Sequence, residues 1–162
     1  MIKKATIKDI PLIQDLAEKS WRSHYPGIIS PEQIDFMLNL MYSEEEITSQ
    51  FNNPNYHYYL LGNEKNFYGI MGFENHYEEN TTKLHRIYIT EEGKGKGLGK
   101  EAIQFLKNQI LEVGDQRIIL AVNKQNPSYH FYLSQGFKVY EEGVFDIGNG
   151  FVMDDYLMEW NT

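Results

Sequence analysis

The fold is decided by the stretch Lys94-Gly95-Lys96-Gly97-Leu98-Gly99-Lys100, in which three glycines alternate with other residues and three lysines add charge. An apolar strand candidate (84–89) precedes it. Good helix formers with apolar residues at helical spacing follow it. Glycines let the backbone bend tightly and approach a ligand, and the N-terminus of a helix favours an anion. The stretch therefore predicts a turn that holds a phosphate group between a strand and a helix.

Two well-known phosphate motifs do not fit this loop. A Walker-type loop would need glycine where Lys94 stands and a hydroxyl residue where Glu101 stands. A dinucleotide fingerprint that starts at Gly95 would need glycine at Lys100, and one that starts at Gly93 would need it at Leu98. Taken alone, the loop is equally compatible with a flexible, solvated turn.

The composition sets bounds on the class of protein. The chain has 162 residues and no cysteine, which excludes a disulfide scaffold, a thiolate metal site and a cysteine nucleophile. We expect a reducing cytoplasm as its location and no metal cofactor. The N-terminal residues show no signal peptide, and no apolar run reaches the length of a membrane span, so we expect no membrane partner.

The charge balance argues against a nucleic-acid partner. The formal net charge is −8, and nucleic-acid phosphates would be repelled by such a field. The positive charge at Lys94, Lys96 and Lys100 is a local exception. The acidity could steer a cationic substrate, but it equally serves ordinary solubility.

The rest of the chain predicts a mixed sheet with several helices. Helix starts are indicated by capping patterns at Thr6-Ile7-Lys8-Asp9, Ser30-Pro31-Glu32-Gln33 and Ser43-Glu44-Glu45-Glu46. Two further helices are expected from the glycine loop to about 113 and over 127–135. Strands are expected at 2–7, 56–61, 67–77, 84–89, 117–122, 137–145 and 151–160.

The glycine loop and a second motif together resemble the GNAT superfamily of acetyl-CoA-dependent N-acetyltransferases. The second motif runs from Asn126 through Phe131-Tyr132 to Gly136-Phe137, after a buried strand. The family's loop begins with glutamine or arginine, where this chain has Lys94. The resemblance covers nearly the whole chain and implies one N-acetyltransferase domain over residues 1–162. It implies a mixed, mostly antiparallel sheet of about seven strands, with a splayed central parallel pair and helices on both faces.

The resemblance also implies where the co-substrate acetyl-CoA binds. Its pantetheine arm would lie along Ile87, Tyr88 and Ile89, as an added strand would. Its pyrophosphate would lie on the N–H groups of Lys94, Gly95, Lys96, Gly97, Leu98, Gly99 and Lys100. Asn126 matches an asparagine that contacts the cofactor, although a helix cap is an equal alternative. Tyr132 matches the family's tyrosine that protonates the departing thiolate; as a residue alone, it fits a core aromatic better.

The base and the acceptor site are less defined by the motifs. His85 lies about where many members carry a catalytic glutamate, and its ordinary pKa of about 6.5 would suit a base; a structural histidine is the alternative. Trp21, Tyr25, Glu78, Asp154 and Asp155 are candidates for the acceptor pocket, because aromatic rings and carboxylates suit a cation.

The weaker resemblance of 21–34 and 150–158 to a branch with polyamine acetyltransferases favours an amine acceptor. We expect acetyl transfer to a primary amine, such as a polyamine, another small amine or a peptide amine, by direct attack in a ternary complex. A non-catalytic acyl-CoA-binding module of the same fold is the alternative. Exposed terminal strands could also pair in a homodimer.

Overall fold

The computed structural model describes residues 1–162 and contains one seven-stranded sheet in the order β1-β2-β3-β4-β5-β7-β6. The strands are β1 (Ile2–Lys4), β2 (Tyr56–Gly62), β3 (Phe67–Glu78), β4 (Thr81–Ile89), β5 (Arg117–Asn123), β6 (Lys138–Gly148) and β7 (Phe151–Asn161). The helices are α1 (Ile10–His24), α2 (Pro31–Tyr42), α3 (Glu44–Phe51), α4 (Leu98–Val113) and α5 (Ser128–Ser134). Short 3-10 turns span Ile7–Asp9 and Glu91–Gly93. The prediction of a mixed, mostly antiparallel sheet of about seven strands is confirmed.

The helix starts follow the capping patterns in the sequence. Ser30 Oγ accepts a hydrogen bond from the N–H of Gln33 at 3.1 Å, and Ser43 Oγ accepts one from Glu46 at 3.2 Å. The first strand is shorter than the expected 2–7. Asp9 Oδ2 accepts a hydrogen bond from the backbone N–H of Thr6 at 2.8 Å, and this bond turns the chain out of the sheet. The helix that follows therefore begins only at Ile10.

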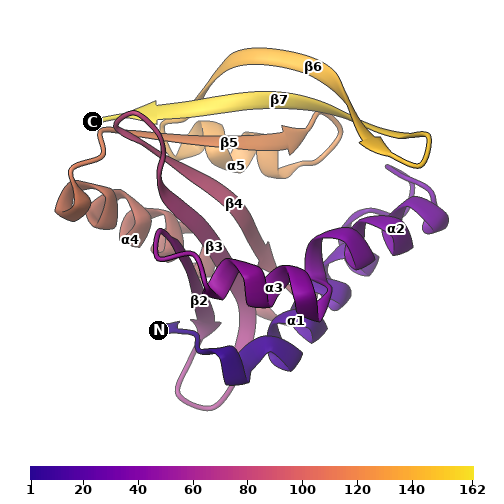
Figure 1. The fold of residues 1–162 in the computed structure, drawn as a ribbon, viewed down its shortest axis with the longest axis horizontal. Helices are drawn as coiled ribbons and strands as arrows, with labels where there is room; N and C mark the ends of the chain where they lie inside the picture. Colours follow the sequence, from indigo (N-terminus) through magenta and orange to yellow (C-terminus); the bar gives the residue numbers. More distant parts are fainter.

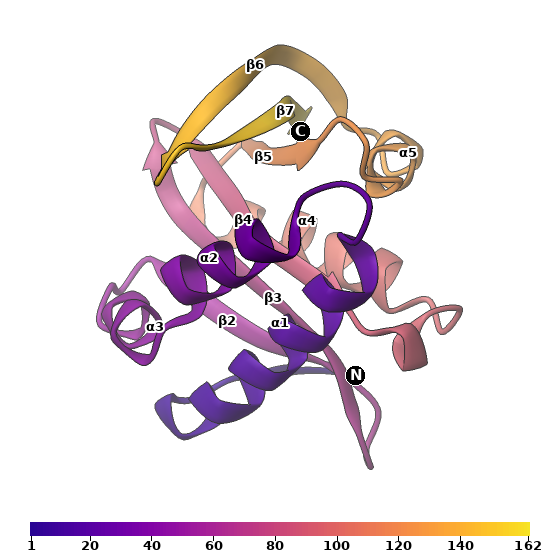
Figure 2. The same ribbon diagram turned by 90° about the vertical axis from the view of Figure 1, so that its right-hand side faces the viewer.

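Two hydrophobic cores lie on opposite faces of the sheet. Helices α1, α2 and α3 cover one face and enclose residues such as Ile13, Trp21 and Ile70. Helix α4 covers the other face and encloses residues such as Ile103, Leu106 and Ile118. Figure 2 shows the first three helices on the side away from α4. The expectation of helices on both faces is confirmed.

No helix combines the length and apolar character that crossing a bilayer requires.

The central parallel pair separates along its length. Strands β4 and β5 are paired only from Thr81 opposite Arg117 to Lys83 opposite Ile119. Beyond that point β4 stays paired with β3, while β5 stays paired with β7. Figure 1 shows β5, β7 and β6 as a group that lies above β2, β3 and β4. The splayed parallel pair expected from the family resemblance is therefore present.

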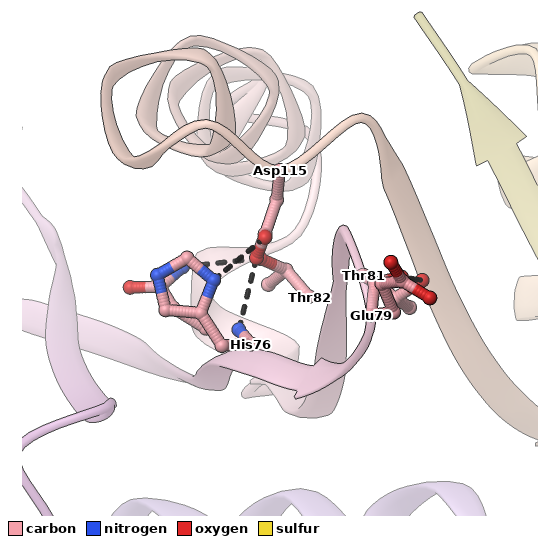
Figure 3. Close-up of polar contacts among 6 residues, drawn as sticks. His76, Glu79, Thr81, Thr82 and Asp115 are labelled. Carbon is pink, nitrogen blue, oxygen red and sulfur yellow. Dashed lines mark hydrogen bonds and ion pairs between the residues drawn. The ribbon is translucent and has the colours of Figure 1, made fainter.

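A buried carboxylate fixes the point at which the two strands begin to diverge (Figure 3). Asp115, which precedes β5, is 1% exposed and accepts three hydrogen bonds. They come from the N–H of His76 at 2.9 Å, from the His76 ring at 2.8 Å and from the Thr82 hydroxyl at 2.6 Å. Thr82 is one of the last β4 residues that still pair with β5. The carboxylate thus joins β3, β4 and β5 at the closed end of the splay.

We expect Asp115→Ala to lower the free energy of unfolding by about 2–4 kcal/mol, because it leaves buried donors without an acceptor. Chemical denaturation followed by circular dichroism measures this change. Asp15→Ala is the control, because Asp15 is exposed and pairs only with Lys19, and its removal should cost about 0.5 kcal/mol or less. Equal stability of the two variants would contradict this role of Asp115.

The edge strands of the sheet are the places where two copies of the chain could pair in the expected homodimer. Strands β1 and β6 are the two edges. Val144, Phe145 and Tyr140 on β6 are exposed apolar side chains. An edge strand offers unpaired backbone groups to another chain, so pairing of two copies along β6 remains a prediction.

Candidate active site

A cleft of about 420 Å³ opens where β4 and β5 diverge. One wall consists of residues 84–89 of β4, and the opposite wall consists of residues 120–122 of β5. The loop before α4 closes one end, and Tyr25, Asn126 and Tyr132 line the interior. The candidate cofactor and catalytic residues from distant parts of the sequence are therefore close together.

The edge of β4 that faces the cleft is free of strand partners. Residues Ile87, Tyr88 and Ile89 pair with Met71, Ile70 and Gly69 of β3 on their other side. On the side of β5, the pairing of β4 with β5 ends at Lys83, before these three residues. An extended ligand can therefore pair with this edge as an added strand does.

The glycine loop has a backbone conformation that requires glycine at two positions. Gly95 and Gly97 have φ angles of +78° and +73°, in the left-handed region. The first backbone hydrogen bond of α4 runs from Glu101 N to Gly97 O. The N–H groups of Leu98, Gly99 and Lys100 therefore have no partner within the helix. A Cβ atom on Gly99 would lie 3.2 Å from Phe131 Cζ. The loop thus packs closely on α5 and presents N–H groups at the positive end of a sixteen-residue helix.

The three loop lysines have different environments. Lys94 Nζ lies 2.7 Å from Glu91 Oε1, and Lys94 lines the cleft. Lys96 lies over the Tyr68 ring, with Nζ 5.3 Å from its centre, and does not line the cleft. Lys100 lines the cleft beside Gly99.

Tyr132 and Asn126 line the cleft from the far side. The Tyr132 ring is buried against Phe131 and Phe137. Burial raises the pKa of Tyr132, and Tyr25 adds to the shift, so the phenol keeps its proton at neutral pH. Asn126 Oδ1 accepts a hydrogen bond from the N–H of Ser128, the first residue of α5, at 2.9 Å, while its Nδ2 lies 3.5 Å from the Tyr25 hydroxyl.

His85 occupies a bulge in β4. Gly72 pairs with Arg86 and Phe73 pairs with Leu84, so the ladder skips His85. Its Nε2 lies 3.0 Å from Glu74 Oε1, and its ring stacks on Tyr56 with 5.1 Å between centres. Burial, with a contribution from Lys83, lowers the pKa of His85 to about 4. The imidazole is therefore uncharged at neutral pH and is a weak proton acceptor.

The five acceptor candidates occupy different places. Tyr25 lines the cleft, and Trp21 is buried behind it with 4.4 Å between the ring centres. Glu78 is exposed near the end of β3 and lies 3.6 Å from Arg117. Asp154 is exposed and lies 3.0 Å from Lys124 Nζ. Asp155, its neighbour on β7, is buried.

The sequence reasoning missed Arg86, which lines the cleft beside His85. The guanidinium is buried, donates to the Tyr58 hydroxyl at 2.7 Å and lies 4.4 Å from the Tyr42 ring centre. An arginine in a strand with apolar residues could have been noted in the sequence, because a guanidinium that is buried needs partners for its charge and its N–H groups. Ser20, His24, Ser128 and Phe131 also line the cleft and were not predicted.

No three or more His, Asp or Glu side chains cluster in a way that could hold a metal ion. The site consists instead of a free strand edge, a helix N-terminus behind a glycine loop, and a buried phenol. These features together define an acyl-CoA-dependent acyltransferase architecture. The Acetyltransferase (GNAT) family model matches residues 13–137, and this chain belongs to that family.

Individual proteins resemble this chain in sequence or in fold. The chain is 28% identical over 156 residues to spermidine N(1)-acetyltransferase from Thermoplasma acidophilum, with 94% of each sequence covered. It superposes on the crystal structure of the PaiA N-acetyltransferase from the same organism in complex with coenzyme A, with a TM-score of 0.85 and 24% identity. That match covers 100% of this chain and 98% of the other. Mutant forms of the spermidine/spermine N-acetyltransferase SpeG from Vibrio cholerae superpose with a TM-score of 0.70 and 20% identity, covering 99% and 93%.

Proposed function

We propose that this acetyltransferase moves the acetyl group of acetyl-CoA to a primary amine of a polyamine, by direct attack in a ternary complex. The observation that carries the proposal is the opening between β4 and β5, which joins the glycine loop to Tyr132. Such a cleft can hold an extended thioester on one side and an amine on the other. It supports direct transfer because both substrates can be present together.

The cofactor site that we propose uses backbone groups for most of its contacts. The pyrophosphate lies at the N–H groups of the loop from Lys94 to Lys100, and the pantetheine arm pairs with Ile87, Tyr88 and Ile89. Lys94 and Lys100 add attraction of about 1 kcal/mol or less each, since both are solvated. Asn126 holds the start of α5 and the Tyr25 hydroxyl beside the reacting end.

Tyr132 is the proton donor to the departing thiolate in this proposal. Its phenol is protonated at neutral pH because burial raises its pKa. A donor aimed at the sulfur stabilises the charge that develops there as the C–S bond breaks. His85 is the candidate base in the sequence, with a structural histidine as the alternative, and a pKa of about 4 and the contact with Glu74 suit a positioning role better.

The acceptor class rests on the relatives and on the local chemistry. The Thermoplasma relative is a spermidine N(1)-acetyltransferase. In this chain Tyr25, which stacks on Trp21, belongs to the cleft lining, and aromatic rings attract cations. A net charge of −8 favours the approach of a polycation.

Thiol release from acetyl-CoA with a panel of amines tests the acceptor class. The panel contains spermidine, free amino acids, aminoglycosides and peptides with free N-termini. We expect spermidine to give the highest kcat/KM. A peptide or an amino acid at the top of the ranking would contradict the polyamine assignment, and binding of acetyl-CoA without turnover on any amine would favour an acyl-CoA-binding module.

A further inference from the structure

One buried charged group near the cleft has no partner, the carboxylate of Asp155 on β7. Its side chain is 9% exposed, and Oδ1 has no hydrogen-bond partner. An unpaired carboxylate inside a protein costs free energy, because water has been removed and no donor replaces it. Such a group is satisfied when a ligand or an ordered water supplies a donor.

The strand register places Asp155 beside the β5 wall of the cleft, although Asp155 itself is not one of the residues that line it. It pairs with Asn123 of β5, directly after the cleft-lining residues 120–122. Met153, two residues earlier and on the same face, contacts Gln33 of α2. Asp155 therefore lies on the α2 side of the sheet, on the face opposite α4.

Two tyrosines that line the cleft lie close to this carboxylate. Burial raises the pKa of Tyr25 and of Tyr88, and the negative charge of Asp155 raises both further. Tyr25 in turn influences Tyr132. The charge of Asp155 thus acts on two tyrosines of the cleft lining, and one of them also acts on the proposed proton donor.

The charged groups around Asp155 leave it without an ion pair. Lys124 is the nearby cation, but its Nζ lies 3.0 Å from Asp154 and 3.4 Å from Glu142. Burial, with a contribution from Asp154, raises the pKa of Asp155 to about 6, against a small opposing effect of Lys124. The group is ionised at neutral pH and holds a proton more strongly than an ordinary aspartate does.

We propose that Asp155 binds the ammonium group of the acceptor amine and removes one of its protons. This step rests on the proposed acetyl transfer. The carboxylate takes a proton from the ammonium group and later releases it to solvent. The neutral nitrogen forms a C–N bond to the thioester carbon, and the C–S bond breaks. Tyr132 gives its proton to the sulfur and is reprotonated by the second proton that the nitrogen loses.

The test compares Asp155→Asn with the wild-type protein, using spermidine and acetyl-CoA. We expect kcat/KM for spermidine to fall about 100-fold or more, since a general base contributes on this scale. The wild-type kcat/KM should fall as pH drops below about 6, where Asp155 becomes protonated, and the variant should lack this decrease. Affinity for acetyl-CoA, measured by calorimetry, should not change.

A thermal melt at neutral pH separates this role from a structural one. Because asparagine removes an unpaired buried charge, the variant should melt at the wild-type temperature or above it. Glu142→Gln is the control for loss of one negative charge nearby, since Glu142 is exposed and contacts only Lys124. It should keep kcat/KM within about twofold.

Three other results would each overturn the proposed role of Asp155. If Asp155→Asn keeps the kcat/KM and pH profile of an active wild-type protein, Asp155 is not the base, although acetyl transfer itself stands. If the variant melts earlier and binds acetyl-CoA more weakly, its role is structural. If the wild-type protein acetylates no amine, the proposed function fails first, and the inference fails with it.

Discussion

Replacement of Tyr132 by phenylalanine should lower kcat about 100-fold while leaving the affinity for acetyl-CoA unchanged. The substitution removes only the hydroxyl group, so the ring keeps its packing against Phe131 and Phe137. Without the phenol, the departing thiolate receives no proton from the protein. Steady-state turnover with saturating spermidine gives kcat, and calorimetric titration gives the dissociation constant of acetyl-CoA.

Tyr129→Phe is the matched control for this change. Tyr129 lies on the same helix and packs against Tyr156, outside the cleft lining. Loss of its hydroxyl should change kcat by about twofold or less. If Tyr132→Phe retained the turnover of this control, Tyr132 would have no place in the chemistry.

The second large effect is expected from Gly97→Val, which should weaken acetyl-CoA binding about 100-fold or more, or roughly 3 kcal/mol. Gly97 has a φ angle of +73°, which valine adopts only at a cost of about 1–3 kcal/mol. The loop must therefore rearrange, and the N–H groups at the start of α4 no longer converge on one anion. Calorimetry with acetyl-CoA measures the loss.

Gly114→Val separates this local effect from general strain. Gly114 ends the same helix with a φ angle of +84° and likewise has open space around it. Both variants should lose similar stability, but only Gly97→Val should lose the cofactor. Wild-type affinity in the Gly97→Val protein would show that the pyrophosphate does not lie on this loop.

Local signals in the sequence were enough to predict much of the architecture. Ser30 and Ser43 begin their helices as their capping patterns indicate, because each hydroxyl satisfies an N–H group three residues later. The glycine loop precedes α4 as expected, because the alternating glycines admit the left-handed conformations found at Gly95 and Gly97. The last turn was predicted too long, over 146–150. Asn149-Gly150, with positive φ at both residues, is a tight hairpin signal and could have corrected it.

The chemistry inside the cleft depends on contacts that local patterns do not contain. The bulge at His85 turns its ring toward Glu74 and Tyr56, on the same face as the contact of Arg86 with Tyr58. No periodicity in the strand predicts such an extra residue. Asp154 and Asp155 are adjacent in the sequence, yet only Asp155 is buried, because successive side chains of a strand face opposite sides of the sheet. Which of the two is buried depends on the pairing of β7 with β5.

The roles proposed for Tyr132, Asp155 and the glycine loop all depend on transfer of an acetyl group from acetyl-CoA to an amine in this cleft. The most direct measurement is mass spectrometry of a mixture of the purified protein, acetyl-CoA and spermidine, with Tyr132→Phe in parallel. We expect free CoA and spermidine that is heavier by one acetyl group, both formed far more slowly by the variant. Bound acetyl-CoA that stays intact, or acetate released while spermidine keeps its mass, would contradict this expectation.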